Sequence, residues 1–265
     1  MSNKPKRAER TERASQQRRE RELEQQRRAR IIVTVIVAVV VLIVVVVAVA
    51  IIPRLGEEGP TPSGITAENG IRSTAAQPTS PTTGGSGSLE PVQVVVYEDF
   101  HCPSCKEFES SAGGYLQQQV DVGAIEVEYR PIAILDRASS TDYSTRSAGA
   151  AACVLEDADV TTFVTFHDAL FANQPAEGGP GLSGDDLVQI AEQSGASGDV
   201  GACITNGTYE DWTARATEAA SQDGVVQTPT VRVNGTDVIG QGGNVPSAQD
   251  LMAAISEARD ATPAS

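Results

Sequence analysis

The sequence predicts an α/β domain with a helical insert, preceded by an apolar segment, and three observations carry that prediction. A short run rich in β-branched residues, 91–97, leads into a Cys-x-x-Cys motif at the start of a helical pattern. Asn234-Gly235 separates two more short strand-like runs, which is the strongest local signal for a β-hairpin. Between these regions, residues 141–222 form a long Ala-rich stretch of helical character. With 265 residues, 40% of them hydrophobic, the chain can bury a full core.

Charges of opposite sign separate the first residues from the rest of the chain. Residues 1–30 carry a net charge of +6 and the remainder −21, which together give the formal −15. An acidic folded part argues against nucleic-acid binding, because phosphate recognition requires a basic surface. We expect residues 1–30 to be a solvated basic tail in the cytoplasm, next to anionic lipid head groups.

An unbroken apolar stretch runs from Ile31 to Ile52. As a helix it would be about 33 Å long, at about 1.5 Å per residue, which is enough to cross the hydrocarbon core of a bilayer. Arginines precede it directly, so the positive-inside rule places the tail in the cytoplasm and everything after Pro53 outside. Cleavage after Ala50 is the alternative, but the stretch before that residue is longer than the signal-peptide norm of about 7–15 residues. We therefore predict a retained single-pass anchor in the cell membrane; both alternatives export the following domain.

Residues 53–88 are rich in Pro, Gly, Ser and Thr and poor in apolar residues. Such a composition does not repay the entropy of ordering the chain. We expect a flexible linker with a root-mean-square reach of roughly 30–36 Å.

The folded domain is predicted to span residues 89–265 and to begin with a β-α-β unit. After the strand at 91–97, a helix over 102–119 is expected, loosened near Gly113-Gly114. A second strand at 124–130 follows, because its apolar and charged residues alternate.

The helical insert is expected over about 138–222, with interruptions at 174–184 and 195–201. Hairpin strands at 230–233 and 237–240 come next, and a last helix over 247–259 begins at Ser247 as its N-cap. A β-α-β unit followed by β-β-α is the thioredoxin topology, here with a helical insert between its halves.

Cys102 and Cys105 lie three positions apart where the first strand meets the first helix. At this spacing residues share a helix face, within the Cα separation that a disulfide allows. The helix N-terminus supplies free N–H groups and a partial positive charge, which stabilise a thiolate at Cys102. We expect Cys102 to be the exposed attacking sulfur and Cys105 the buried resolving one. Pro103 suits the first turn, where its missing N–H costs nothing.

A structural disulfide and a zinc site are alternative explanations of the Cys-x-x-Cys motif. A zinc site needs two more ligands, whereas Cys153 and Cys203 lie 50 positions apart and the chain has only two histidines. The strand before the motif, the helix after it and Thr228-Pro229 ahead of the hairpin favour a redox pair, which needs neither a metal nor a cofactor.

The run Tyr97-x-Asp99-Phe100-x-Cys102-Pro103-x-Cys105, with Val226-Gln227-Thr228-Pro229-Thr230 downstream, resembles the DsbA-like branch of the thioredoxin superfamily over about residues 90–260. The resemblance implies a thioredoxin fold with an inserted helical domain. It also implies a cis peptide at Thr228-Pro229 that faces the dithiol, where substrate backbone pairs beside Cys102. Substrates would be exported proteins with free cysteines, and a membrane protein of the DsbB or vitamin K epoxide reductase type would reoxidise the enzyme.

The chain departs from this family at two positions. Many relatives carry a Glu on the strand six residues before the first cysteine, where this chain has Val96. That leaves Glu98 and Asp99 as candidate proton relays. Ser104 replaces the His of strongly oxidising members, which removes one stabiliser of the thiolate and is expected to make the disulfide less oxidising.

His101, Pro103 and Ser104 are therefore the expected tuning residues around the dithiol, and His101 could replace part of the lost imidazole effect. His167, the other histidine, is expected to be a partly buried helix residue and not a catalyst. Trp212 is expected to pack in the core or between domains.

Cys153 and Cys203 both lie on apolar helical stretches of the predicted insert. They are either two buried free cysteines or a disulfide, and the export of the domain and the even cysteine count favour the disulfide. Some actinobacterial relatives have a comparable second bridge. We assign this pair a structural role, stabilising the fold by about 4 kcal/mol in the loop-entropy model.

These features predict a membrane-tethered extracytoplasmic thiol–disulfide oxidoreductase that forms disulfides in exported proteins through Cys102 and Cys105. A reductase or isomerase with the same chemistry is the first alternative. A non-catalytic anchored binding module with a structural disulfide is the second.

Overall fold

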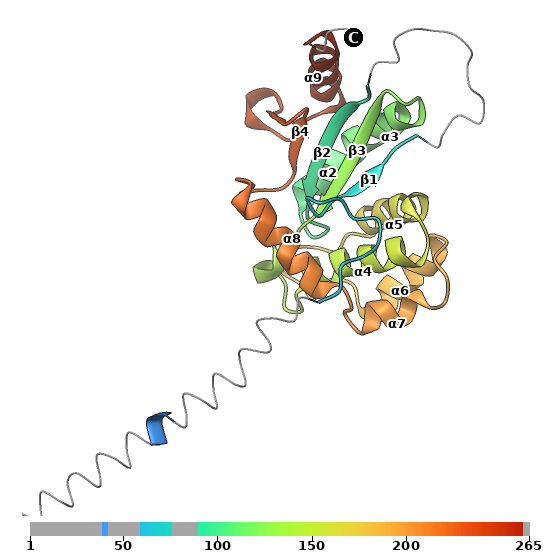
Figure 1. Cartoon of the computed structure of the whole chain (residues 1–265), viewed down its shortest axis with the longest axis vertical. Coiled ribbons are helices and arrows are strands. Elements are labelled where there is room, and N and C mark those ends of the chain that lie inside the picture. The colour runs from blue at the N-terminus through green and yellow to red at the C-terminus, as the bar shows by residue number, and fades with distance from the viewer. Residues whose placement is uncertain (1–38, 42–58, 76–89, 262–265) are drawn as a thin grey trace, which may run out of the picture. The chain divides into compact units, whose positions relative to one another are not determined.

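The computed structural model describes residues 39–41, 59–75 and 90–261 (Figure 1). The chain divides into two compact units, residues 1–58 and 59–265. Within the described residues, no helix is both long and apolar enough to cross a membrane. The predicted tail, all of the predicted anchor except residues 39–41, and the linker parts 53–58 and 76–88 lie outside the described residues.

A five-stranded sheet in the order β1-β3-β2-β4-β5 is the centre of the second unit. The strands are β1 (Ile71–Ser73), β2 (Val92–Glu98), β3 (Ile125–Pro131), β4 (Thr230–Val233) and β5 (Thr236–Val238). β2 and β3 run parallel, and the other neighbouring strands are antiparallel. A parallel pair requires a crossover, which the helices after β2 provide. The predicted thioredoxin topology is therefore present, with β1 added at one edge.

The hairpin between β4 and β5 turns at Asn234 and Gly235, which both have positive φ, as a tight hairpin turn requires. β5 ends at Val238, two residues before the predicted end, because Gly240 already bonds to the carbonyl of Asn244 in the next turn.

One face of the sheet is apolar and carries the main core. Val92, Val94 and Val96 of β2 alternate onto this face and are at most 4% exposed. Four helical segments pack on it: α2 (Pro103–Phe108), η1 (Glu109–Gly113), α3 (Gly114–Asp121) and α9 (Ala248–Ala261). Since α2 begins at the carboxyl end of β2, this packing fixes the Cys-x-x-Cys motif on a rigid support.

The predicted loosening near Gly113-Gly114 is a π-helical turn, η1, between α2 and α3. Such turns are rare and occur mostly as single-turn interruptions of α-helices, often at functional sites. Ala112 on the turn is fully buried, so the interruption belongs to the core face.

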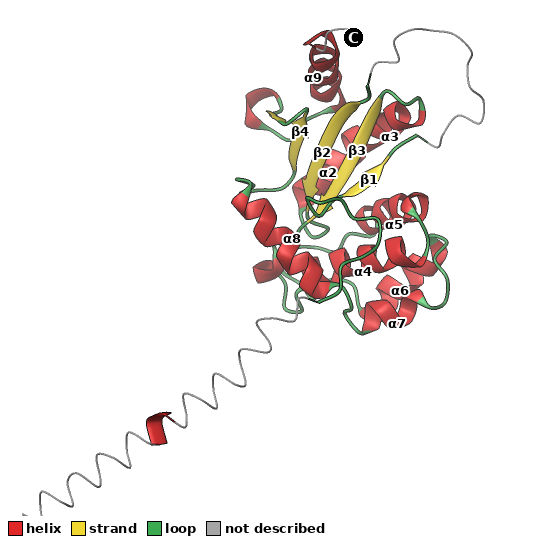
Figure 2. Cartoon of the chain, viewed as in Figure 1, coloured by secondary structure: helices red, strands yellow, loops and turns green. Residues whose placement is uncertain are grey.

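The insert consists of helices joined by loops (Figure 2). Its helices are α4 (Tyr143–Asp157), α5 (Val160–Ala172), α6 (Gly184–Gln193), α7 (Val200–Thr205) and α8 (Glu210–Gln222). A disulfide joins Cys153 of α4 to Cys203 of α7, which confirms the predicted pairing. Trp212 on α8 is fully buried, as expected.

The prediction of a flexible linker over 53–88 is wrong for residues 59–75. Ile71 of β1 is fully buried, and β1 pairs with β3 along the sheet edge. Glu156 of α4 accepts a hydrogen bond from the backbone N–H of Ser63 at 2.6 Å, and Arg215 of α8 donates to the carbonyl of Gly59. A few apolar residues in a Pro- and Gly-rich segment were enough to dock it, because the sheet offered an unpaired edge.

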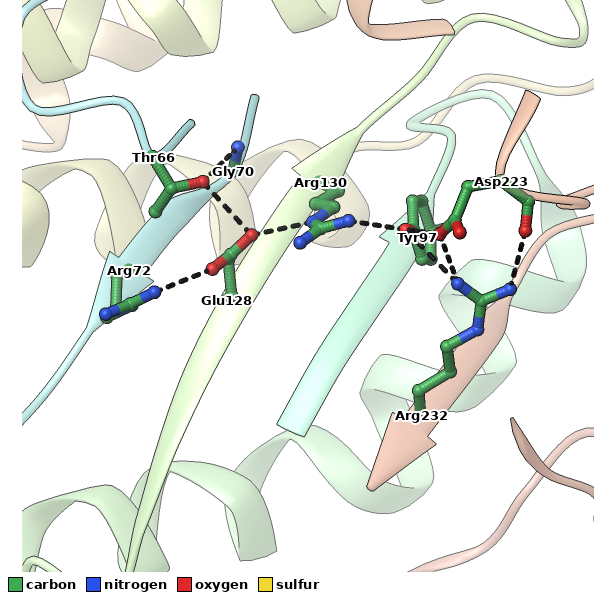
Figure 3. A network of polar contacts seen from close by, with 8 residues as sticks. All are labelled: Thr66, Gly70, Arg72, Tyr97, Glu128, Arg130, Asp223 and Arg232. Atoms are coloured by element: carbon green, nitrogen blue, oxygen red, sulfur yellow. Dashed lines mark hydrogen bonds and ion pairs between the residues drawn. The ribbon is translucent and has the colours of Figure 1, made fainter. Parts of the chain in front are cut away.

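The opposite face of the sheet carries a polar network that crosses four strands (Figure 3). Its side chains are Arg72 on β1, Glu128 and Arg130 on β3, Tyr97 on β2, Arg232 on β4, and Asp223 directly after α8. The Tyr97 hydroxyl donates to Asp223 at 2.6 Å. The network thus ties the end of the insert to the sheet.

Candidate functional site

The dithiol lies where the chain leaves β2 and enters α2. Cys102 is the N-cap of α2 and Pro103 occupies its first turn. The backbone N–H of Cys102 donates to the carbonyl of Asp99 at 2.9 Å, which closes the turn after the strand. Cys105 then follows one helical turn into α2, with its N–H bonded to the carbonyl of Cys102.

The two cysteines differ in access to solvent. Both are free thiols, and the exposed fraction is 7% for Cys102 and 0% for Cys105. Both are therefore buried, and the prediction of an exposed Cys102 sulfur is wrong, but Cys102 is the more accessible of the two, as predicted.

The surroundings make Cys102 acidic. The Cys105 side chain hydrogen-bonds to the Cys102 sulfur, and together with Thr228 and the backbone N–H groups of Cys105 and Ser104 this lowers the pKa of Cys102 to about 5. Burial, followed by the interaction with Cys102, raises the pKa of Cys105 well above its usual value. One thiol of the pair is thus ionised at neutral pH while the other keeps its proton.

The Thr228-Pro229 peptide bond is cis and lies at the dithiol. The carbonyl oxygen of Thr228 is 3.4 Å from the Cys102 sulfur and accepts a hydrogen bond from Cys102 when the thiol is protonated. Thr228 and Pro229 are buried, whereas Val226 just before them is 87% exposed. The loop therefore combines a fixed backbone beside Cys102 with an apolar side chain in solvent.

The three expected tuning residues act in different ways. Ser104 contributes its backbone N–H to the acidity of Cys102, and Pro103 begins the helix. The His101 ring is fully buried, edge-on against Tyr143, with Nε2 3.4 Å from the carbonyl of Ala176 in the insert. Among the described residues, no hydrogen bond joins this ring to either cysteine. His101 thus contacts the insert and does not replace the missing imidazole.

Gln174, in the loop after α5, is a site residue that sequence reasoning missed. Its side-chain amide donates to the carbonyls of Phe100 and Cys102 at 3.0 and 2.9 Å. The insert thereby holds the backbone of the motif from 72 positions away. The sequence gives no local signal for this contact, because Gln174 lies in a loop, where no helical or strand periodicity indicates which way a side chain points.

The two carboxylates next to the motif point to different partners. Asp99 accepts hydrogen bonds from the backbone N–H groups of His101 and Leu135, both at 2.9 Å, and burial raises its pKa to about 6. Glu98 is fully buried, and its Oε1 lies 2.6 Å from Nε2 of His167 on α5. His167 is itself fully buried, not partly buried as predicted.

The chain is similar to known proteins in both sequence and fold. A protein-family model described as thioredoxin matches residues 78–256. The reduced disulfide bond oxidoreductase DsbG of Mycobacterium tuberculosis is 34% identical, with a TM-score of 0.60, over 75% of this chain and 91% of that one. Oxidised DsbA of the same organism is 35% identical, with a TM-score of 0.59, over 73% of this chain and 94% of that one.

Two further matches are more distant or shorter. The thiol-disulfide oxidoreductase MdbA of Corynebacterium diphtheriae shares 22% identity at a TM-score of 0.57, covering 78% of this chain and 96% of that one, which shows a common fold. The serine/threonine-protein kinase PknE of M. tuberculosis is 30% identical over 124 residues, which are 45% of this chain. That match spans only 22% of the kinase.

Proposed function

Because the chain belongs to the thioredoxin family and is a thiol–disulfide oxidoreductase of the DsbA type, we propose that it forms disulfide bonds in exported proteins, with Cys102 as the sulfur that the substrate attacks and Cys105 as the buried thiol that leaves. The observation that carries the proposal is the acidity of Cys102, whose pKa is lowered to about 5 by the Cys105 side chain and nearby backbone N–H groups. A stabilised thiolate favours the reduced enzyme, so the oxidised enzyme gives up its disulfide readily.

The reaction is an exchange of two electrons. A substrate thiolate attacks Cys102 of the oxidised pair, the Cys102–Cys105 bond breaks, and Cys105 leaves as a thiolate that takes up a proton. A second substrate thiolate then attacks the substrate sulfur of the mixed disulfide, and Cys102 leaves as a thiolate. The substrate has lost two electrons and the enzyme is a dithiol. A low pKa makes Cys102 a good leaving group in this second step.

The Thr228-Pro229 loop is the proposed substrate-binding edge. The backbone beside Cys102 is held at 3.4 Å from the sulfur, so an extended substrate could pair with it next to the reacting disulfide. The exposed side chain of Val226 would add apolar contact to an unfolded substrate.

The proposed setting is the outer face of the cell membrane. The apolar stretch 31–52 with arginines before it supports a single-pass anchor with a cytoplasmic N-terminus. Reoxidation would require a membrane partner that accepts two electrons, and we propose one of the DsbB or vitamin K epoxide reductase type.

The reduction potential of the full-length chain, measured in glutathione buffers with thiol trapping and mass spectrometry, tests the direction of electron flow. An oxidase should equilibrate near roughly −120 mV, whereas a value near roughly −270 mV would make the protein a reductase. A Cys102–Cys105 bond that resists reduction below about −300 mV would identify a structural disulfide and refute the proposal. A double variant, Cys153→Ser with Cys203→Ser, is the matched control and should leave the potential of the first pair unchanged.

A further inference from the structure

A buried group of ligand-type side chains lies close to the dithiol, where, after burial and the interaction with Cys102, the charge of Glu98 helps to raise the pKa of Cys105. Glu98 at the end of β2, Glu109 on η1 and His167 on α5 bring their ligand atoms within 4.8 Å of one another. Glu98 and His167 are both fully buried. Two carboxylates and one imidazole therefore meet where three separate elements pack together.

The carboxylates in this group are not fully satisfied. Oε2 of Glu98 and Oε1 of Glu109 are buried and have no hydrogen-bond partner among the described residues. A buried carboxylate oxygen without a partner is costly, and buried charges in proteins are usually paired or bound to a metal. These two oxygens are therefore free to accept a ligand.

The histidine is arranged as a metal ligand usually is. Its Nε2 faces Glu98, while its Nδ1 lies 2.9 Å from a carboxylate oxygen of Asp168 on the same helix. Histidines that bind metals almost always donate their other ring N–H to a carboxylate or carbonyl, which fixes the ring. The Asp168 side chain is 68% exposed, so this outer contact lies toward solvent.

The backbone leaves room for Glu109. A Cβ atom on Gly113 would lie 2.4 Å from Oε2 of Glu109, so only a glycine at this position lets the carboxylate lie where it does. Two surface pockets are both lined by Glu109, Gly113 and Asp168, which provides a route from solvent to the group.

We propose that Glu98, Glu109 and His167 form a binding site for one divalent transition-metal ion, with Zn²⁺ as the best-matched probe. The donor set of one nitrogen and two carboxylate oxygens suits Zn²⁺. Burial raises the pKa of Glu109 to about 8, so the ion would bind in place of a proton on this carboxyl group. Tetrahedral ligands at about 2.0–2.2 Å from one ion are about 3.3–3.6 Å apart. Nε2 of His167 and Oε1 of Glu98, now 2.6 Å apart, would therefore separate slightly, and the three ligand atoms, all within 4.8 Å of one another, would close around the ion. Water from the pockets would fill the fourth position.

Zinc binding to the full-length chain in detergent tests this directly. The chain is kept untagged and its Cys102–Cys105 pair is oxidised, so that neither a histidine tag nor a free thiol binds the ion. Equilibrium dialysis followed by metal analysis should give one Zn²⁺ per chain. Ca²⁺, which requires six or more oxygen ligands, should bind far more weakly.

Four variants and one control decide whether the named residues hold the ion. His167→Gln and Glu109→Gln should reduce Zn²⁺ affinity by more than about 100-fold, and Asp168→Asn by about tenfold. Gly113→Ala, which displaces the Glu109 carboxylate, should also weaken binding. Glu107→Gln, an exposed carboxylate on the neighbouring helix α2, should change nothing.

Two results would overturn the proposal. One is the absence of bound Zn²⁺ at millimolar concentration, which would make the group an internal ion pair only. The other is Zn²⁺ bound with the same affinity in Asp168→Asn, Gly113→Ala and the wild type, which would place the ion elsewhere. Both of these variants lie at the surface end of the group, so they remain informative if a substitution of buried His167 prevents folding.

Discussion

The two cysteine pairs lie in different regions, the sheet and the insert, and the surroundings give their sulfur atoms different chemical roles. Cys102 and Cys105 sit at the end of the sheet, close in sequence and free, and the Cys105 side chain and nearby backbone N–H groups lower the pKa of Cys102. Cys153 and Cys203 sit inside the insert, 50 positions apart and joined between α4 and α7. In the first region the surroundings stabilise a thiolate; in the second the bridge closes a long loop.

The difference shows that position on the backbone decides the role of a cysteine here. A thiol at a helix N-cap with hydrogen-bond donors around its sulfur becomes a nucleophile and leaving group. Cys153 and Cys203 lie on packed helices and are bonded to each other, so neither is a free nucleophile. Substitutions in the two regions should therefore affect activity and stability separately.

The largest expected effect is on activity, in the sheet region. Cys102→Ser removes the sulfur that the substrate attacks and should lower the rate of disulfide formation in a reduced test protein by more than about 1,000-fold. Cys105→Ser cannot form the Cys102–Cys105 disulfide and should be equally inactive towards the reduced protein. Its Cys102 thiolate can still attack a disulfide of an oxidised test protein, and because no Cys105 thiol is present to release that bond, mixed disulfides should accumulate on non-reducing gels. Full activity in Cys102→Ser would remove the distinction between the two pairs.

The next effect is on stability, in the insert. Replacing both Cys153 and Cys203 by Ala should lower the free energy of unfolding by about 4 kcal/mol, because the loop of 50 residues is no longer closed in the unfolded chain. Urea denaturation measures this. Disulfide formation by the folded variant should stay near the wild-type rate, and a large loss of turnover under native conditions would show that the pair is not purely structural.

A third substitution tests whether residues 59–75 support the sheet region. Ile71→Ala on β1 removes a fully buried side chain and should cost about 3 kcal/mol of unfolding free energy. Glu68→Ala, an exposed neighbour in the same segment, is the control and should have little effect. If the two variants were equally stable, residues 59–75 would not support the sheet and would be the flexible linker that their composition predicts.

The smallest effect concerns the contact between the two regions. Tyr97→Phe removes the hydroxyl that donates to Asp223 after α8 and accepts from Arg130, and should cost about 1 kcal/mol (Figure 3). Tyr115→Phe on α3 is the matched control. A cost near zero for Tyr97→Phe would mean that the polar network does not couple the insert to the sheet.

Much of the fold followed from short-range patterns in the sequence. The β-branched run of β2, the alternation in β3 and the Asn234-Gly235 turn each predicted an element that the structure contains, because each reflects the local backbone. The order of these elements then led to the thioredoxin topology.

The contacts that local patterns do not encode were missed. β1 was not predicted, because its segment has the composition of a linker and its pairing depends on the edge of β3, more than 50 positions away. The Glu98–His167 contact joins residues 69 positions apart, and Gln174 reaches the motif across 72. These side chains meet only because the insert packs against the sheet, and the spacing of residues in the sequence does not reveal such tertiary contacts.

The pH dependence of Cys102 ionisation tests the central claim most directly. Because the pKa of Cys102 is lowered to about 5, chiefly by the Cys105 side chain, ionisation favours the reduced folded form. That contribution is complete above the unfolded pKa of about 8.5 and is lost as the pH falls towards 5. Thiolate absorbance at 240 nm of the reduced full-length chain should therefore titrate with a midpoint near pH 5. A midpoint between about 8 and 9, the range of an ordinary thiol, would contradict the account.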